Sequence, residues 1–348
     1  MKNRVHKTGG RKSTRFVNKQ LSDLWKIPTP EGYGISEPFR PEEFAAALRR
    51  LKPGMSPELD AIFPEFILHV GSALKPWFCD FLNSCMCQLK IPKIWRRALV
   101  VGIPQPEKPL GDPKSYRPIS LLCVPFEILE RVNYAHVETI IDPLLPQEQA
   151  GFRHGRSALE QVILLTQDIE HSFSAKKKAR AVFVDLTAAY DTVWHRGLTC
   201  KLLRLLPDRH MVHMIMEMVG NRSFTLTTGN SKRSRLRRLK NGVPQGSVLA
   251  PLLFNIYISD LPTTISRKYA CADDLATMHA DGDWQAVKGA LTKDMAILGY
   301  FQTWKLKLST SKTVSAVFHL NNKEAKRELK VSSTTKPCSS SPSRNTSE

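Results

Sequence analysis

Three aspartates follow apolar stretches of this chain and could hold metal ions. Asp185 comes directly after the apolar run at 181–184, and Asp273 and Asp274 stand side by side in the stretch YACADDLA. Enzymes that transfer phosphoryl groups with two divalent metals need carboxylates that meet at one point, with about 4 Å between the metals. Oxygen ligands favour Mg²⁺. The aspartates therefore predict a site for two magnesium ions, while ordinary turn-forming aspartates remain the alternative for each motif taken alone.

The residues around these aspartates predict the elements that would position them. Residues 181–184 predict a buried strand that ends at Asp185, and the pair Asp273-Asp274 is expected at the tight turn of a hairpin. The two motifs lie far apart in the sequence, but adjacent strands of one sheet would bring them together.

A glycine-containing segment before the hairpin predicts a second functional element. Gly242 and Gly246 flank Pro244-Gln245, and a helix is expected to begin after Ser247. Backbone without side chains at a helix N-terminus allows a bound nucleotide to approach closely. The alternative is an ordinary loop before a buried helix.

The remaining pattern is mostly helical in the first half of the chain. Apolar residues recur at helical spacing after Pro41, and a helical stretch is expected from about residue 63 to 89. Residues 99–104 predict a short strand, and the second half of 116–141 predicts another helix.

A predicted hairpin after residue 222 carries a row of cations on its returning strand. Its tip is expected at Gly229-Asn230. The row includes Arg233, Arg235, Arg237 and Arg238. Such a row would contact the phosphates of a template or primer, an interaction that weakens with salt; a solvated strand face is the alternative.

Composition also points to a polyanionic partner. The chain has 51 Lys and Arg against 32 Asp and Glu, a formal net charge of +19, and nucleic acid is preferred to a membrane surface. Its longest apolar run, at 248–258, is interrupted by Pro251 and Asn255 and is shorter than the roughly 20 residues of a membrane span. We expect no membrane segment, no secretion, and a nuclear or cytoplasmic protein whose seven cysteines are reduced.

The motifs, taken in order, resemble those of the reverse transcriptases of non-LTR (LINE-like, jockey-type) retrotransposons. The segments similar to motifs A, B and C of that family are AVFVDLTAAYDTVW, NGVPQGSVLAPLLFNIYISDLP and YACADDLA. Two segments resemble the finger motifs of the family, namely SYRPISLLCVPFEILERV and QAGFRHGRSALEQV. The segment PGMSPELDAIFPEF resembles its earlier helical block, and WKLKLSTSKTVSAVFHL resembles its motif D. The resemblance covers about residues 41–330 and implies an RNA-directed DNA polymerase.

The resemblance implies a catalytic role for each aspartate. Asp185 and Asp273 would bind two Mg²⁺ ions, with Asp274 as the third acid, while a primer 3′-hydroxyl attacks the α-phosphate of a dNTP and pyrophosphate leaves. The partners would be an RNA template, a DNA primer and dNTPs. Tyr190 matches the bulky gate that clashes with a ribose 2′-hydroxyl, with a core aromatic as the alternative. Lys312 matches the motif D lysine that could protonate pyrophosphate, with a surface lysine as the alternative.

Other residues match nucleotide contacts of the family. Arg117 would hold the triphosphate through the fork geometry of its guanidinium. Lys114 and Arg153 are further candidates, for which a solvated loop charge is the alternative. Gln245 and Gly246 would line the template and the incoming base pair.

Three departures from the family pattern point to a truncated or damaged copy. Cys271 stands where the family has Tyr or Phe, a ring that packs near the primer end. The match stops soon after NNKEAKRELKV, where the family continues into the primer grip and thumb. Neither an endonuclease domain nor an RNase H or zinc knuckle is recognisable.

These observations predict an α+β right-hand polymerase fold without its thumb. The expected parts are a basic disordered arm and linker at 1–40, helical fingers at 41–175, a palm of antiparallel strands backed by helices at 176–320, and a disordered tail at 321–348. The predicted function is RNA-directed DNA synthesis. The alternatives are a catalytically inactive nucleic-acid-binding remnant and a degenerate copy that does not fold stably. The oligomeric state is left open.

Overall fold

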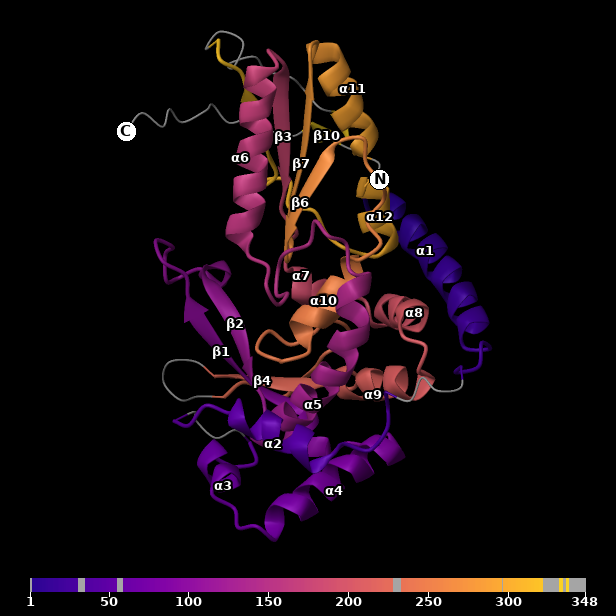
Figure 1. Ribbon diagram of the computed structural model, residues 1–348, viewed down its shortest axis with the longest axis vertical. Coiled ribbons are helices and arrows are strands. Elements are labelled where there is room, and N and C mark those ends of the chain that lie inside the picture. The colour runs from indigo at the N-terminus through magenta and orange to yellow at the C-terminus, as the bar shows by residue number, and fades with distance from the viewer. Residues whose placement is uncertain are drawn as a thin grey trace. The chain divides into compact units, whose positions relative to one another are not determined.

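The computed structural model describes residues 2–30, 35–54, 59–227, 233–295, 297–321, 332–333 and 336–337. The chain forms two compact units, each assembled from separate segments (Figure 1). Unit 1 comprises residues 1–16, 145–192 and 257–348, and unit 2 comprises residues 17–144 and 193–256.

Unit 1 is built on an antiparallel sheet with strand order β6-β7-β3-β8. The strands are β6 (Arg267–Cys271), β7 (Asp274–Asp281), β3 (Lys178–Val184) and β8 (Val314–Phe318). β3 is central and mostly buried, because five of the seven residues in KARAVFV are apolar and small or β-branched residues pack well on a pleated surface. The strand predicted at 181–184 is confirmed.

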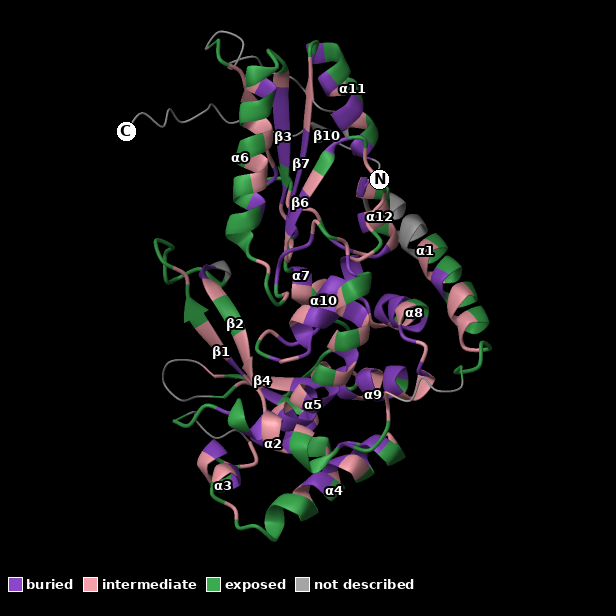
Figure 2. Cartoon of the chain, in the orientation of Figure 1, coloured by how far each residue is buried: buried purple, intermediate pink, exposed green. Residues whose placement is uncertain are grey.

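Helices cover both sides of this sheet (Figure 1). Leu164, Leu165 and Ile169 of α6 (Ala158–Ser174) pack against an apolar cluster that includes Ala181 and Met278. On the other side, α11 (Trp284–Asp294) contacts β7 and β3. Figure 2 shows the central strands as buried and much of α6 as exposed. Unit 1 also contains α7 (Ala189–Thr192), α12 (Ile297–Thr303), β9 (Ser332–Ser333) and β10 (Lys336–Pro337).

Unit 2 is mainly helical and has a second sheet, in the order β2-β1-β4-β5. Its strands are β1 (Arg97–Pro104), β2 (Tyr116–Leu121), β4 (Ser223–Thr227) and β5 (Arg237–Arg238). Its helices are α2 (Pro41–Arg49), α3 (Pro64–Leu68), α4 (Leu74–Gln88), α5 (Val124–Ile141), α8 (His195–Leu205) and α9 (Arg209–Val219), with short 3₁₀ turns η1 (Lys93–Arg96), η2 (Pro113–Ser115) and η3 (Asp142–Leu144). α10 (Ala250–Ile258) crosses the boundary at residue 256.

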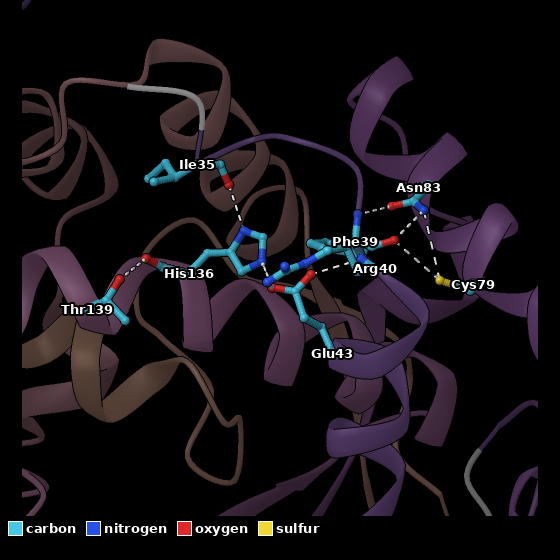
Figure 3. A network of polar contacts seen from close by, with 8 residues as sticks. All are labelled: Ile35, Phe39, Arg40, Glu43, Cys79, Asn83, His136 and Thr139. Carbon is cyan, nitrogen blue, oxygen red and sulfur yellow. Dashed lines mark hydrogen bonds and ion pairs between the residues drawn. The ribbon is translucent and has the colours of Figure 1, made fainter. Parts of the chain in front are cut away.

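A polar network fastens the segment before α2 to two helices of unit 2 (Figure 3). The imidazole of His136 on α5 contacts the Ile35 carbonyl at 2.8 Å through Nδ1 and the Glu43 carboxylate at 2.9 Å through Nε2. The side-chain amide of Asn83 on α4 accepts from the Phe39 N–H at 2.6 Å and donates to the Phe39 carbonyl at 3.0 Å. These contacts satisfy backbone groups that the non-helical segment would otherwise leave unpaired.

The N-terminal arm is helical where the sequence predicts disorder. α1 runs over Lys2–Leu24. Val17 is fully buried, the Arg196 guanidinium donates to the Asn18 side chain at 2.9 Å, and Trp25 stacks on His213 at a 4.3 Å centroid distance. The prediction of disorder is therefore wrong for this segment, because its few apolar residues find partners that composition alone does not reveal.

Other sequence predictions have mixed outcomes. The strand at 99–104 and the helix in the second half of 116–141 are confirmed by β1 and α5. The helical stretch predicted at 63–89 is occupied by two helices, α3 and α4, with Gly71 between them. The predicted division at residue 175 does not coincide with a unit boundary, because α6 packs on β3. The tail at 321–348 lies almost wholly outside the described residues.

Among the described residues, no helix is both long enough and apolar enough to cross a membrane.

Candidate active site

The first aspartate lies at the end of the central strand of unit 1. Asp185 follows β3 directly, and its carbonyl oxygen accepts from the Ser309 N–H at 2.9 Å. Next to it, the Thr187 N–H donates to the Lys307 carbonyl at 2.7 Å. The segment before β8 therefore fixes the backbone on which the Asp185 carboxylate stands.

The aspartate pair lies at the turn between two strands of the same sheet. Cys271 at the end of β6 pairs with Asp274 at the start of β7, so that Ala272 and Asp273 form the turn. β7 pairs antiparallel with β3, and Leu275 lies opposite Val184. One step further in the same register, toward the β6–β7 turn, Asp274 of β7 lies beside Asp185, which follows β3. The hairpin and the adjacency of the two motifs are confirmed.

Burial and like charge raise the pKa of one carboxyl in this cluster. Burial is the largest cause of the raised pKa of Asp273, and the charges of Asp274 and Asp185 add to it. The Lys312 charge acts in the opposite direction. The Lys312 ammonium lies 3.6 Å from a carboxylate oxygen of Asp185, and its side chain is 66% exposed. Negative charge is thus concentrated here and only partly compensated by a flexible cation.

These carboxylates have the donor chemistry of a divalent-metal site, although the described side chains do not converge as tightly as bound ligands. Asp185, Asp273 and Asp274 offer only oxygen atoms, as Mg²⁺ prefers. After burial, the charges of Asp274 and Asp185 raise the pKa of Asp273, and a bound cation would offset these charges. Within the described part of the chain, no three His, Cys, Asp or Glu side chains form a group able to hold a metal as they stand.

A tyrosine lies close to the acidic turn. Tyr190 is on α7, its ring meets the Phe152 ring edge to face with centroids 6.4 Å apart, and the ring is partly buried. Burial, and then the charge of Asp273, raise the pKa of the Tyr190 phenol, which therefore stays neutral. The predicted gate residue and the acidic turn lie in the same unit.

Cys271 borders a cavity next to the aspartates. The cavity has a volume of about 370 Å³, and Phe183, Cys271, Asp185, Asp274 and Lys312 are among its lining residues. Burial, and then the two neighbouring aspartates, raise the pKa of the Cys271 thiol. A larger side chain at position 271 would project toward space that the small thiol leaves open.

Unit 2 contains the second group of predicted site residues. Arg117 is exposed on β2, and three residues later the Ser120 N–H donates to the Gln245 carbonyl at 2.7 Å. Gly246 has φ of +110°, and a Cβ there would lie 2.5 Å from the Ser120 carbonyl oxygen. Only glycine fits at position 246, because both the positive φ and the strand beside it exclude a side chain.

A buried glutamate that the sequence analysis missed holds the turn after Gly246. The Glu130 carboxylate accepts from the Ser247 hydroxyl and, at 2.9 Å, from the Val248 N–H. The helix expected after Ser247 begins at Ala250, and the Val248 N–H before it is engaged by Glu130. Burial raises the pKa of Glu130 to about 7, against the Ser247 hydrogen bond and the Arg222 charge. The sequence did offer one signal for Glu130, namely an acidic residue among the apolar residues of the helix.

Arg222 is the buried counter-charge of Glu130. Its Nη1 donates to the Met218 carbonyl at 3.1 Å, and its guanidinium lies 5.0 Å from the Phe126 ring centroid. Burial lowers the pKa of Arg222, while the Glu130 charge opposes that shift.

Replacing Glu130 by glutamine should weaken the pH dependence of stability. The carboxyl binds its proton more tightly when folded, with a pKa of about 7 against 4.5, so its contribution to stability is greatest below about pH 4.5 and is lost as the pH rises to about 7. Glu130→Gln stays neutral throughout. We expect urea unfolding measured from about pH 5 to 8 to show a smaller loss of stability for Glu130→Gln than for the unmodified chain.

The matched control is Glu127→Gln, one turn earlier on α5, where the carboxylate is ion-paired with Arg131 at 2.6 Å. This variant keeps the Glu130 carboxyl and should retain most of the pH dependence, because the Glu127 charge is the smallest of the causes that act on the pKa of Glu130. An unchanged slope in Glu130→Gln would show that the Glu130 carboxyl does not titrate in this range.

The predicted cationic row is exposed in unit 2. β4 and β5 pair antiparallel, with Phe224 opposite Arg237, and the predicted hairpin is confirmed. Its tip lies outside the described residues. All four predicted cations of the row are exposed, namely Arg233, Arg235, Arg237 and Arg238.

Two further candidates are placed less directly. Arg153 in unit 1 donates from Nη1 to the carbonyls of Pro146 at 2.8 Å and Gln149 at 3.2 Å, so part of its guanidinium holds the local backbone. Lys114 is in η2, and its side chain lies outside the described residues.

Comparison with known proteins adds a family match. The sequence model described as "Reverse transcriptase (RNA-dependent DNA polymerase)" matches residues 103–336. The chain is 32% identical over 88% of its length to the probable RNA-directed DNA polymerase from transposon BS of Drosophila melanogaster, covering 36% of that protein. It is 30% identical over 68% of its length to the RNA-directed DNA polymerase from mobile element jockey of the same organism, covering 27% of it.

A more distant match is the Pol polyprotein of retrotransposable element R2 of Popillia japonica, 25% identical over 64% of the chain and covering 30% of that protein. The chain therefore spans about a third of the length of the curated relatives that it matches.

Proposed function

Because this chain belongs to the reverse transcriptase (RNA-dependent DNA polymerase) family, we propose that it extends a DNA primer along an RNA template with dNTPs. The observation that carries the proposal is the meeting of Asp185, at the end of β3, with the Asp273-Asp274 turn on the neighbouring strand β7. In this proposal unit 1 contains the palm of a right-hand polymerase, and the helical part of unit 2 contributes the fingers.

The chemistry is a nucleotidyl transfer. The primer 3′-hydroxyl gives its proton to solvent water and its oxygen forms a bond to the α-phosphorus of the dNTP. The bond from that phosphorus to the bridging oxygen breaks, and pyrophosphate leaves. Bound Mg²⁺ ions would stabilise the negative charge of the attacking and leaving oxygens. Asp185 and Asp273 would hold two such ions, and Asp274 would be the third acid of the group. Lys312, whose ammonium lies beside Asp185, gives a proton to the leaving pyrophosphate.

The remaining predicted site residues bind the nucleotide in this proposal. The Arg117 guanidinium offers paired N–H donors to the triphosphate, and Lys114 and Arg153 add positive charge. Gln245 and Gly246 line the template and incoming base. The hydrogen bonds of this turn support the role of Gln245 and Gly246. The Gln245 carbonyl accepts from the Ser120 N–H, and the Val248 N–H donates to Glu130.

The test is incorporation of dTTP by the purified chain on a poly(rA) template with an oligo(dT) primer, in Mg²⁺ and in EDTA. We expect Mg²⁺-dependent extension. Nucleic-acid binding without extension would reject the polymerase in favour of an inactive binding remnant.

Neutralising the exposed cationic row should reduce the salt sensitivity of RNA binding. Each arginine that no longer neutralises a phosphate should lower the slope of log K against log salt concentration by roughly 0.7–0.9. We expect Arg235→Gln with Arg237→Gln to flatten that slope in filter-binding or anisotropy titrations. Arg49→Gln with Arg50→Gln removes the same charge from exposed positions near the end of α2 and should leave the slope nearly unchanged. Equal slopes for both double variants would show that the cationic row does not contact the RNA phosphates.

Restoring an aromatic ring at position 271 should increase primer extension. A ring at the end of β6 would border the cavity beside Asp185 and Asp274, where the resemblance puts the primer end. One aromatic contact to a nucleotide is worth about 1–3 kcal/mol. We therefore expect Cys271→Tyr to raise the extension rate at limiting primer. Cys87→Tyr, an identical change at an exposed site on α4, should have no effect. An unchanged extension rate in Cys271→Tyr would show that the cysteine does not impair primer extension.

A further inference from the structure

The turn that carries Asp273 is held by a buried side chain from a different part of unit 1. Ala272 has φ of +57°, a left-handed conformation that costs roughly 1–2 kcal/mol for a residue with a Cβ. The Gln149 side chain binds both backbone groups of Ala272. Its Oε1 accepts from the Ala272 N–H at 2.8 Å, and its Nε2 donates to the Ala272 carbonyl at 3.1 Å.

The segment around Gln149 is itself pinned to the strand that leads into this turn. The Ala150 N–H donates to the Ala270 carbonyl at 2.9 Å, and the Ala270 N–H donates to the Glu148 carbonyl at 3.0 Å. Gln149 is 4% exposed, so its amide is screened from water, and its Oε1 also accepts from the Gly151 N–H at 2.9 Å.

The two segments pack too closely at Gly151 to admit a side chain there. A Cβ on Gly151 would lie 2.1 Å from the Ala272 nitrogen. The Arg153 guanidinium closes the same segment by donating to the Gln149 carbonyl at 3.2 Å. Two kinds of contact therefore hold the turn at Ala272: close backbone packing against Gly151, and the hydrogen bonds of the Gln149 amide.

We propose that Gln149 is a positioning residue: its side chain holds Ala272 in the left-handed conformation and so orients the Asp273 carboxylate for metal binding. The amide contacts neither the nucleotide nor a reacting atom in this arrangement. It acts by removing alternative conformations of the turn, in the way that an outer-shell partner orients a metal ligand. The inference rests on the proposed polymerase function for its consequence in catalysis, but the hold on Ala272 does not depend on activity.

The first test is the exchange of the Ala272 amide hydrogen with solvent, measured by mass spectrometry with fragmentation that resolves residues 270–274. Gln149→Met keeps the volume and removes all three hydrogen bonds. Gln149→Glu keeps an acceptor for the Ala272 and Gly151 N–H groups. We expect exchange at Ala272 to be about tenfold faster in Gln149→Met, as for loss of one hydrogen bond, and to increase less in Gln149→Glu, which keeps the acceptor but loses the donor to the Ala272 carbonyl.

The second test is Mn²⁺ affinity, measured by titration with electron paramagnetic resonance detection in the absence of nucleic acid. Gln149→Met should weaken Mn²⁺ binding by about 10- to 100-fold, as for loss of an outer-shell partner. In primer extension its kcat should fall while its KM for dTTP changes little. Gln88→Met makes the same substitution at an exposed site on α4 and should match the unmodified chain in every assay.

The outcomes separate the two proposals. If the unmodified chain does not extend a primer, the polymerase proposal fails, and amide exchange and Mn²⁺ affinity still decide the role of Gln149. If Gln149→Met exchanges Ala272 and binds Mn²⁺ as the unmodified chain does, Gln149 does not position the turn. If Gln149→Met does not fold, as judged by circular dichroism, fast exchange at Ala272 in a folded Gln149→Glu would also overturn the proposal.

Discussion

Asp185→Ala is expected to abolish primer extension while leaving RNA binding almost unchanged. Asp185 directly follows the central strand, beside the Asp273-Asp274 turn, and β3 itself contains no acid. Loss of a direct ligand should cost more than the roughly 10- to 100-fold that loss of an outer-shell partner costs. The measurement is single-nucleotide extension on poly(rA)/oligo(dT), with RNA affinity measured in parallel.

The matched control for this variant is Asp281→Ala. Asp281 ends the same strand that Asp274 begins, and it pairs with Lys178 at the far end of the sheet. Asp281→Ala removes one negative charge from the same sheet, as Asp185→Ala does, but leaves the acidic turn intact. Primer extension should therefore persist. Equal extension by the Asp185→Ala and unmodified chains would exclude the acidic cluster as the catalytic site.

Tyr190→Ala is expected to admit ribonucleotides. Burial, and then the Asp273 charge, raise the pKa of the Tyr190 phenol, and its ring meets the Phe152 ring edge to face. If the ring excludes the ribose 2′-hydroxyl by steric conflict, its removal should raise the ratio of rUTP to dTTP incorporation by about 10- to 200-fold, the range for a small group in a tight pocket. The measurement is kcat/KM for both nucleotides on the same primer.

Tyr190→Phe distinguishes the ring from the hydroxyl. Phenylalanine keeps the ring and its edge-to-face contact with Phe152, so sugar selectivity should be retained. A gain of rUTP incorporation in Tyr190→Phe would assign the discrimination to the phenolic hydroxyl, and unchanged selectivity in Tyr190→Ala would make Tyr190 a packing residue.

The sequence by itself determined the parts of unit 1 that depend on local pattern. A short apolar run followed by Asp185 is sufficient to predict β3, and YACADDLA is sufficient to predict the β6–β7 hairpin, because strand and turn propensities act over a few residues. The adjacency of the two motifs was expected if their strands were neighbours in one sheet. It is confirmed by the pairing of β3 with β7.

Only the tertiary structure decided which side chains support those motifs. Glu130 and Gln149 are polar residues whose partners, Val248 and Ala272, lie more than a hundred residues away in the sequence. Their importance comes from burial with satisfied hydrogen bonds, which no local pattern encodes. The helix at the N-terminus was missed for the same reason, since Val17 becomes fully buried only when distant parts of the chain surround it.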